Sequence, residues 1–188
     1  MINILGITGS LRQGSFNTAL LRACVPLMPQ DVTLDIKFLH GIPLYDGDVE
    51  AREGIPAGVA TLKNAVAAAH GVILATPEYN NGIPGVFKNA IDWMSRPPAD
   101  IPRVFRARVV GLMGASPGPF GTELSQAAWL PVLHTLGTRP WFGKRIRISG
   151  ADKVFDAQGT LQDAKVRGQL QQYLDGFVAF VRAQSPVA

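Results

Sequence analysis

The stretch INILGITGSLRQGSFNTALLRACV, from Ile2 to Val25, passes from an apolar run through a polar loop into a helical pattern. Its first seven residues are rich in isoleucine and leucine, which favours a strand. From Asn17 onward, apolar residues recur three and four positions apart, as the buried face of a helix requires. Pro26 follows and is expected to end or bend that helix. The stretch therefore predicts a strand, a loop and a helix in that order.

The same alternation of strand and helix continues through the rest of the chain. Further strands are expected at residues 32–39, 71–76, 107–116 and 145–148, and helices at 58–70, 85–95, 122–137 and 161–183. The continuous apolar run at 71–76 is typical of a strand buried on both faces, and residues 107–116 are expected to form another buried strand. The pattern predicts an α/β fold in one domain, residues 1–188: a flavodoxin-like, doubly wound, five-stranded parallel sheet of order 2-1-3-4-5 with helices on both faces.

The predicted strand order places a ligand site at the carboxyl ends of the first and third strands, where the winding reverses. The loop after the first strand is GSLRQGSFN, residues 9–17, and the loop after the third begins TPEYNNGIPG, residues 76–85. Both loops are rich in glycine and polar side chains. They are far apart in the sequence, but the fold predicts that they lie side by side.

The first loop is similar to known phosphate-binding loops without matching them. Gly9 and Gly14 have the spacing of a Walker A loop, but Ser15 and Phe16 replace its lysine and its hydroxyl residue. Hydrolysis of a nucleoside triphosphate would lack its two main charge stabilisers here. The dinucleotide pattern GxGxxG also fails, because the glycine spacing is wrong.

The remaining groups of the first loop suit a phosphate monoester that is bound and not transferred. Ser10 and Ser15 offer hydroxyl donors, and the Arg12 guanidinium is a charged fork for a dianion. Asn17 stands near the start of a helix, where free N–H groups favour an anion. The alternative is an ordinary strand-to-helix turn in which Ser15 caps the helix.

The second loop suits a flat heteroaromatic ligand. Pro77 and the Asn80–Gly82 turn can hold main-chain N–H and C=O groups in fixed positions, so that they bind the edge of a ring such as a flavin. Tyr79 would supply an apolar wall. The alternative is that Tyr79 and Trp93 are packing residues.

Together the two loops resemble those of the NADPH-dependent FMN reductases, in particular the chromate and quinone reductases. The matching segments are GSLRQGSFN and TPEYNNGIPGVFKNAIDW, residues 76–93, in the same order and at a matching separation. The resemblance implies an enzyme with FMN as its cofactor and NADPH or NADH as electron donor. It also implies a small-molecule acceptor, such as a quinone, chromate, an azo compound or free flavin, and assembly as a homodimer or homotetramer.

The resemblance implies a cofactor site built from three loops. The residues implied to hold the FMN phosphate are Ser10, Arg12, Ser15 and Asn17, with Leu11, Gln13, Gly14 and Phe16 lining that loop. Those implied to line the isoalloxazine ring, largely through their backbone, are Pro77, Glu78, Tyr79 and Asn80. The third loop, ASPGPFGT at residues 115–122, would close the site with Ser116. No catalytic acid or base is assigned, because the flavin carries the chemistry.

Two other functions compete with this interpretation. A flavodoxin-like electron carrier would share the fold without turning over substrate, but the net charge of +4 favours an anionic nicotinamide donor. A serine esterase is suggested by GASPG, residues 114–118, with Ser116, Glu123 and His134 in triad order. Against it, Pro117 has no N–H for the oxyanion hole. The apolar surroundings of His134 in the sequence also predict packing in the core.

Composition and motif patterns exclude several other classes. No apolar run approaches the ~20 residues of a membrane span, so no membrane association is expected. The single cysteine, Cys24, lies in a predicted helix and is expected to be buried, and a chain without disulfides suits the reducing cytoplasm. The three histidines are scattered without a metal-binding pattern. The arginines within Ser95–Arg108 predict a solvated loop and no nucleic-acid partner.

Overall fold

The sheet of the computed structural model, which describes residues 1–184, has the strand order β2-β1-β3-β4-β5. The strands are β1 Ile2–Thr8, β2 Val32–Lys37, β3 Gly71–Ala75, β4 Val109–Ala115, β5 Arg139–Pro140 and β6 Ile146–Ile148. All neighbouring strands are parallel. The predicted order is therefore confirmed, with one difference: two short strands, β5 and β6, both pair with β4 and share the fifth position. β5 pairs with Val109 and Val110 at the start of β4, and β6 pairs with Met113–Ala115 at its end.

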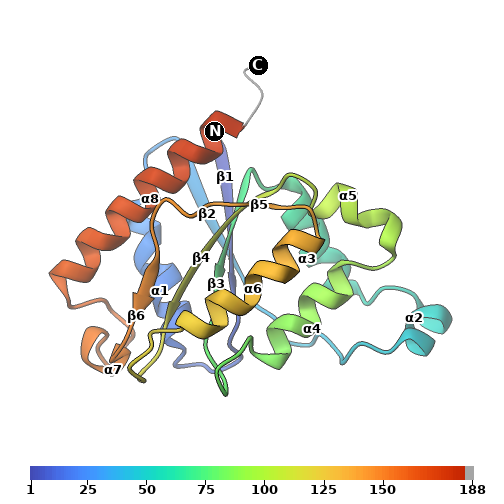
Figure 1. The fold of residues 1–188 in the computed structure, drawn as a ribbon, viewed down its shortest axis with the longest axis horizontal. Helices are drawn as coiled ribbons and strands as arrows, with labels where there is room; N and C mark the ends of the chain where they lie inside the picture. The colour runs from blue at the N-terminus through green and yellow to red at the C-terminus, as the bar shows by residue number, and fades with distance from the viewer. Residues whose placement is uncertain (185–188) are drawn as a thin grey trace.

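Helices cover both faces of the sheet (Figure 1). They are α1 Phe16–Cys24, α2 Gly47–Glu53, α3 Ala57–Ala68, α4 Gly85–Met94, α5 Ile101–Val104, α6 Glu123–Thr135, α7 Ala151–Val154 and α8 Ala164–Gln184. One apolar core lies between the sheet and α1 and α8, and the other between the sheet and α3, α4 and α6. Successive side chains of β1 point to opposite faces of the sheet, so Ile4 belongs to the first core and Leu5 to the second.

The short helices α2, α5 and α7 are the elements that the sequence did not predict. The expectation of a loop at Ser95–Arg108 is wrong in part, because a 3-10 turn at Pro98–Asp100 leads into α5. Segments of four to seven residues are too short to show a helical period.

Cys24 is fully buried as expected, and burial raises the pKa of its thiol to about 12. Within residues 1–184, no helix combines the length and the apolar character needed to cross a membrane.

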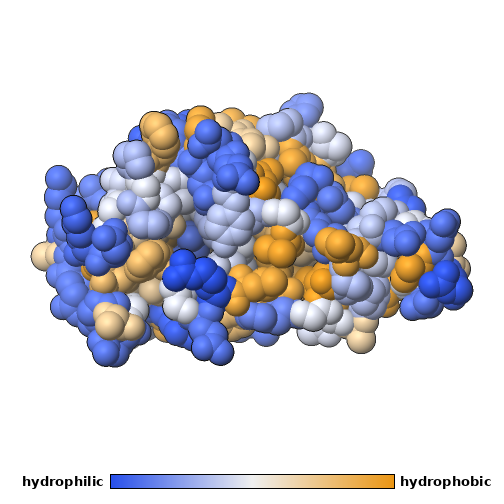
Figure 2. Space-filling model, turned by 90° about the horizontal axis from the view of Figure 1, so that it is seen from below, coloured by the Kyte–Doolittle hydropathy of each residue, from blue (hydrophilic) through white to orange (hydrophobic). Residues whose placement is uncertain are grey.

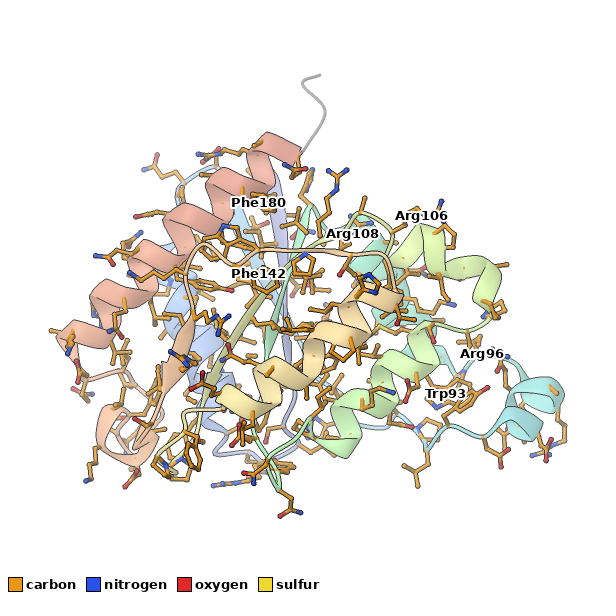
Figure 3. The ribbon with its side chains drawn as sticks, viewed as in Figure 1. Trp93, Arg96, Arg106, Arg108, Phe142 and Phe180 are labelled. Atoms are coloured by element: carbon orange, nitrogen blue, oxygen red, sulfur yellow. The ribbon has the colours of Figure 1, made fainter. Side chains whose placement is uncertain are left out.

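The arginines near the start of β4 stabilise the fold at the edge of the sheet opposite the strands' carboxyl ends (Figure 3). Arg108 donates to the carbonyl of Ala67 at 3.0 Å and to that of Ala69, and so satisfies the carboxyl end of α3. Arg103 pairs with Asp100 at 2.9 Å. Arg103 and the buried Lys63 hold the pKa of Asp100 well below its usual range. β4 spans seven residues, or about 20 Å, so these arginines lie far from the predicted ligand site.

Tyr173 of α8 is fully buried against β4, and its hydroxyl has no hydrogen-bond partner among the residues that the structure describes. Gly111 of β4 makes room for it, because a Cβ there would overlap the Tyr173 hydroxyl and lie 3.0 Å from Phe177 Cε2. Trp141 packs edge-on at 5.0 Å between ring centroids. Desolvation raises the pKa of Tyr173 well above its ordinary value. The tyrosine ring stabilises this core, while its hydroxyl does not.

Replacing Tyr173 with phenylalanine is expected to raise the free energy of unfolding by about 1 kcal/mol. The substitution keeps the ring and removes a buried polar group whose desolvation is uncompensated. Urea unfolding measures the change. The matched control is Tyr45→Phe, which removes a hydroxyl that donates to Glu50 Oε2 at 3.0 Å and should not stabilise the protein. A loss of stability in Tyr173→Phe would mean that the hydroxyl has a partner.

Candidate functional site

Three loops meet at the carboxyl edge of the sheet and enclose a pocket of about 70 Å³. They follow β1, β3 and β4, which are neighbours in the sheet (Figure 1). The lining residues are Ser10, Arg12, Ser15, Phe16, Asn17, Pro77, Glu78, Tyr79, Ala115, Ser116 and Pro117. Most of the implied site residues are therefore brought together here. Leu11, Gln13, Gly14 and Asn80 do not line this pocket, and Gln13 and Gly14 line a neighbouring cavity of about 490 Å³ instead.

The first loop combines a helix cap with unused hydrogen-bond donors. Ser15 caps α1, because its Oγ accepts from the Thr18 N–H at 3.3 Å, and its own hydroxyl proton stays available. The first intrahelical bond is donated by Ala19 to the Ser15 carbonyl. The N–H groups of Phe16 and Asn17 precede it and have no acceptor within the helix. A capped helix start of this kind still favours an anion.

Arg12 is the charged group of this loop. Its side chain is exposed, and no carboxylate within residues 1–184 forms an ion pair with it. Its backbone N–H donates to Ser10 Oγ at 3.3 Å, and Ser10 Oγ lies 3.5 Å from the Tyr79 hydroxyl oxygen. An unpaired guanidinium beside hydroxyl donors and free N–H groups fits a phosphate dianion. On this donor set, the loop fits the phosphate of a mononucleotide.

Asn17 has a structural task in addition to the phosphate role that the resemblance implies. It is buried, its Nδ2 donates to the Ala115 carbonyl at 2.9 Å, and its Oδ1 accepts from the Ala115 N–H at 3.0 Å. The carboxamide thereby ties the first loop to the end of β4. Its second N–H and the second lone pair of Oδ1 are left for a ligand. The sequence could not indicate this link, because the partner lies 98 positions away.

The second loop forms a tight turn that exposes Tyr79. Tyr79 and Gly82 exchange backbone hydrogen bonds of 3.3 and 3.1 Å, and Asn80 and Asn81 have φ of 50° and 63°. Asparagine tolerates this left-handed conformation better than most side chains. Tyr79 is 46% exposed and free to contact a ligand. Trp93, by contrast, is buried, and its indole N–H donates to the Pro43 carbonyl at 2.9 Å, so it is a packing residue.

The third loop does not contain an esterase triad. Ser116 Oγ donates to the Gly118 carbonyl at 3.4 Å, and Glu123 pairs with Arg147. Glu123 begins α6 while His134 lies in its last turn, about 16 Å further along the helix. His134 is also exposed, so the expectation that it packs in the core is wrong. Only one side of an amphipathic helix is buried, and the sequence pattern did not show which side holds His134.

His40 contributes to the site, although no pattern in the sequence indicates it. The ring Nε2 of His40 lies 3.1 Å from the carbonyl oxygen of Leu11, so the segment after β2 supports the first loop. No motif contains His40. Its place just after β2, the neighbour of β1 in the sheet, is the one feature that could have suggested a role. Within the described part of the chain, no three His, Cys, Asp or Glu side chains are placed to hold a metal ion.

Comparison with known proteins decides the family. The model of the NADPH-dependent FMN reductase family matches residues 2–146, which contain all three loops. The chain belongs to this family. The FMN reductase identified in this way is 41% identical over 181 residues to an NAD(P)H-dependent FMN reductase from Pseudomonas aeruginosa, covering 96% of each chain.

Two further relatives extend the comparison. The FMN reductase is 33% identical over 181 residues to a 2-hydroxy-1,4-benzoquinone reductase from a Burkholderia species, covering 96% of its own chain and 97% of the relative. Its fold matches the solved structure of FerB, a flavoenzyme NAD(P)H:(acceptor) oxidoreductase from Paracoccus denitrificans, with a TM-score of 0.85 and 30% identity over 98% of this chain and 99% of FerB. The chain is thus an NAD(P)H-dependent FMN reductase with a flavodoxin-like fold, and the carrier and esterase alternatives are set aside.

Proposed function

We propose that the FMN reductase binds FMN in the three-loop pocket and transfers electrons from NADPH or NADH to a small-molecule acceptor, with quinones as the favoured class. The observation that carries this proposal is the meeting of the three loops around an unpaired Arg12. FMN when bound supplies the hydride and electron transfer chemistry, and the protein supplies binding and orientation. Two relatives support the acceptor class, since one is named a benzoquinone reductase and another, from Escherichia coli, a quinone reductase.

Each loop has a distinct task in this proposal. Arg12, Ser10, Ser15 and the start of α1 bind the terminal phosphate, which stays uncleaved because the loop lacks the lysine of a Walker A motif. The backbone of residues 77–80 orients the ring by hydrogen bonds to its edge, and Tyr79 gives it an apolar wall. The third loop, with Ser116, closes the pocket opposite the second.

The surface around the pocket suits an apolar, flat acceptor. Several large apolar side chains of the three loops and the start of α6 are exposed at this edge: Leu11, Tyr79, Phe120 and Leu124. Figure 2 looks onto the carboxyl edge and shows apolar side chains gathered beside polar ones. A quinone can bury its ring against such a surface, whereas chromate offers no apolar area. Azo compounds and free flavin are flat as well and are tested as rival acceptors.

The experiment measures oxidation of NADPH and of NADH by the purified protein loaded with FMN. With 1,4-benzoquinone as acceptor, many turnovers per flavin and parallel double-reciprocal plots are expected, because donor and acceptor use the same ring face in turn. Chromate, an azo dye and free FMN replace the quinone in parallel assays. A protein that FMN cannot turn yellow, or one that stops after a single turnover, would contradict the proposal.

We infer further that the protein assembles as a homodimer or homotetramer. Leu124 and Leu130 on α6 are exposed apolar side chains. Phe142, labelled in Figure 3, is exposed as well and lines the same surface pocket as Leu130. Isolated surface leucines are ordinary, but a group of large apolar side chains around one helix favours an interface. Light scattering coupled to gel filtration measures the mass. A monomer at every concentration would overturn this inference.

A further inference from the structure

Helix α6 begins without a cap from its own N-terminal residues. Its N-cap residue, Thr122, makes no side-chain capping bond, and Thr122 Oγ1 accepts instead from Gln126 Nε2 at 3.1 Å. The acceptor at this helix start comes from the second loop. Glu78 Oε2 accepts from the backbone N–H of Ser125, the third residue of α6, at 3.0 Å. Glu78 therefore caps a helix that begins 45 positions later in the chain, and its negative charge suits the positive end of the helix dipole.

A second, fully buried connection joins the same loop to the same helix turn. The Thr76 and Ser125 hydroxyl oxygens lie 2.8 Å apart, and the Trp129 indole N–H donates to Thr76 Oγ1 at 3.1 Å. Thr76 Oγ1 donates its single proton to the Pro77 carbonyl at 3.0 Å. Ser125 must therefore donate to Thr76. Residues 76–78 are tied to α6 at both ends, once through Thr76 and once through Glu78.

We propose that Glu78 is a positioning residue: its carboxylate caps α6 and thereby holds the second loop in the conformation that binds FMN. The same carboxylate places a fixed negative charge beside the flavin ring. This rests on the proposed binding of FMN in the three-loop pocket, which Glu78 lines. Reduction at neutral pH adds two electrons and one proton to a flavin, so the reduced form carries one more negative charge. A fixed carboxylate nearby disfavours that form, and protein charges near a flavin tune its electronics in this way.

Two substitutions of Glu78 distinguish its role as a helix cap from its role as a negative charge. Glu78→Gln keeps the length of the side chain and an oxygen that can accept from Ser125, but it removes the charge. Glu78→Ala removes both. We expect Glu78→Ala to weaken FMN binding about tenfold, because the second loop then loses the carboxylate that ties it to the start of α6. Glu78→Gln is expected to bind FMN within about twofold of the wild type. Both are expected to raise the midpoint potential of bound FMN by about 30 mV, which for a two-electron couple corresponds to a tenfold change in the equilibrium constant.

The experiment titrates FMN into apo-protein by fluorescence quenching and measures the potential of the loaded proteins by spectroelectrochemistry. The matched control is Glu123→Gln, which removes a carboxylate from the first turn of the same helix. Glu123 is exposed and pairs with Arg147, so its loss should leave the FMN affinity unchanged and move the potential little. Circular dichroism confirms that every variant is folded.

Rescue of FMN affinity by glutamine, together with a raised potential in both Glu78 variants, supports the proposal. Wild-type affinity in Glu78→Ala would overturn the positioning role, and so would a Glu78→Gln that binds as weakly as Glu78→Ala. An unchanged potential in Glu78→Gln would overturn the electrostatic role. A wild-type protein that does not bind FMN would overturn the proposed function itself, and the first titration reveals this before any variant is compared.

Discussion

Replacing Arg12 with alanine is expected to weaken FMN binding about 100-fold, the largest loss of affinity expected from any one side chain of the three loops. The guanidinium is exposed, unpaired within residues 1–184 and part of the pocket lining. Charge-assisted hydrogen bonds to a phosphate dianion contribute about 1.5–3 kcal/mol each. A loss of about 2.8 kcal/mol corresponds to 100-fold in the dissociation constant.

Comparison of FMN with riboflavin makes the Arg12 experiment specific. Riboflavin lacks the phosphate, so it should bind more weakly than FMN. Its dissociation constant should be the same for the wild type and for Arg12→Ala, because Arg12 has no phosphate to contact. Isothermal titration with both ligands measures this. The matched control is Arg22→Ala, because Arg22 lies on α1 and lines the neighbouring cavity instead of the site. Equal FMN affinity in Arg12→Ala and the wild type would show that Arg12 does not anchor the phosphate.

Replacing Gly9 with alanine is expected to lower the free energy of unfolding by about 3 kcal/mol. A Cβ at Gly9 would lie 2.8 Å from Phe87 Cε1 and 2.9 Å from Pro77 Cδ, closer than carbon atoms approach. Phe87 is fully buried and packs edge-on against Trp129, so its ring cannot swing aside cheaply. Overpacking of this kind typically costs about 1–3 kcal/mol. The same clash would push the first two loops apart.

The control for Gly9→Ala lies five residues away in the same loop. A Cβ at Gly14 would meet no atom within 4 Å, so Gly14→Ala should change the stability by less than about 1 kcal/mol. Urea unfolding compares the two. Adding Phe87→Leu to Gly9→Ala should recover part of the loss, since the two sites are in contact. Equal stability of Gly9→Ala and Gly14→Ala would refute the clash.

The fold was largely readable from the sequence because its main elements have strong local patterns. The uninterrupted apolar run of β3 indicated a strand buried on both faces, and the spacing of apolar residues in α1 and α4 indicated helices. The split of the fifth strand was not readable, because β5 and β6 span only two and three residues, too few to show an alternating pattern. The short helices gave no period long enough to detect.

The positions of the site loops followed from the strand order, but the tasks of individual residues did not. Ser15 could be predicted as a cap from its place before a helix, and the structure confirms it. Asn17, by its chemistry, looked like a ligand residue, and half of its hydrogen-bonding capacity goes to Ala115. Glu78 lines the three-loop pocket, and its carboxylate in addition caps α6, which the sequence did not indicate.

By itself, the sequence determined the doubly wound sheet, the two loops that meet at its carboxyl edge, and the family. These follow from hydrophobic periodicity and from motifs of neighbouring residues, and both are local properties of the chain. Only the tertiary structure decided which polar side chains stay free for a ligand and which hold the loops together. A side chain's hydrogen-bond partner is chosen by proximity in space, and for Asn17 and Glu78 that partner lies 98 and 47 positions away. Arg12 is left without an ion-pair partner among residues 1–184, and so its charge remains available to an anionic ligand.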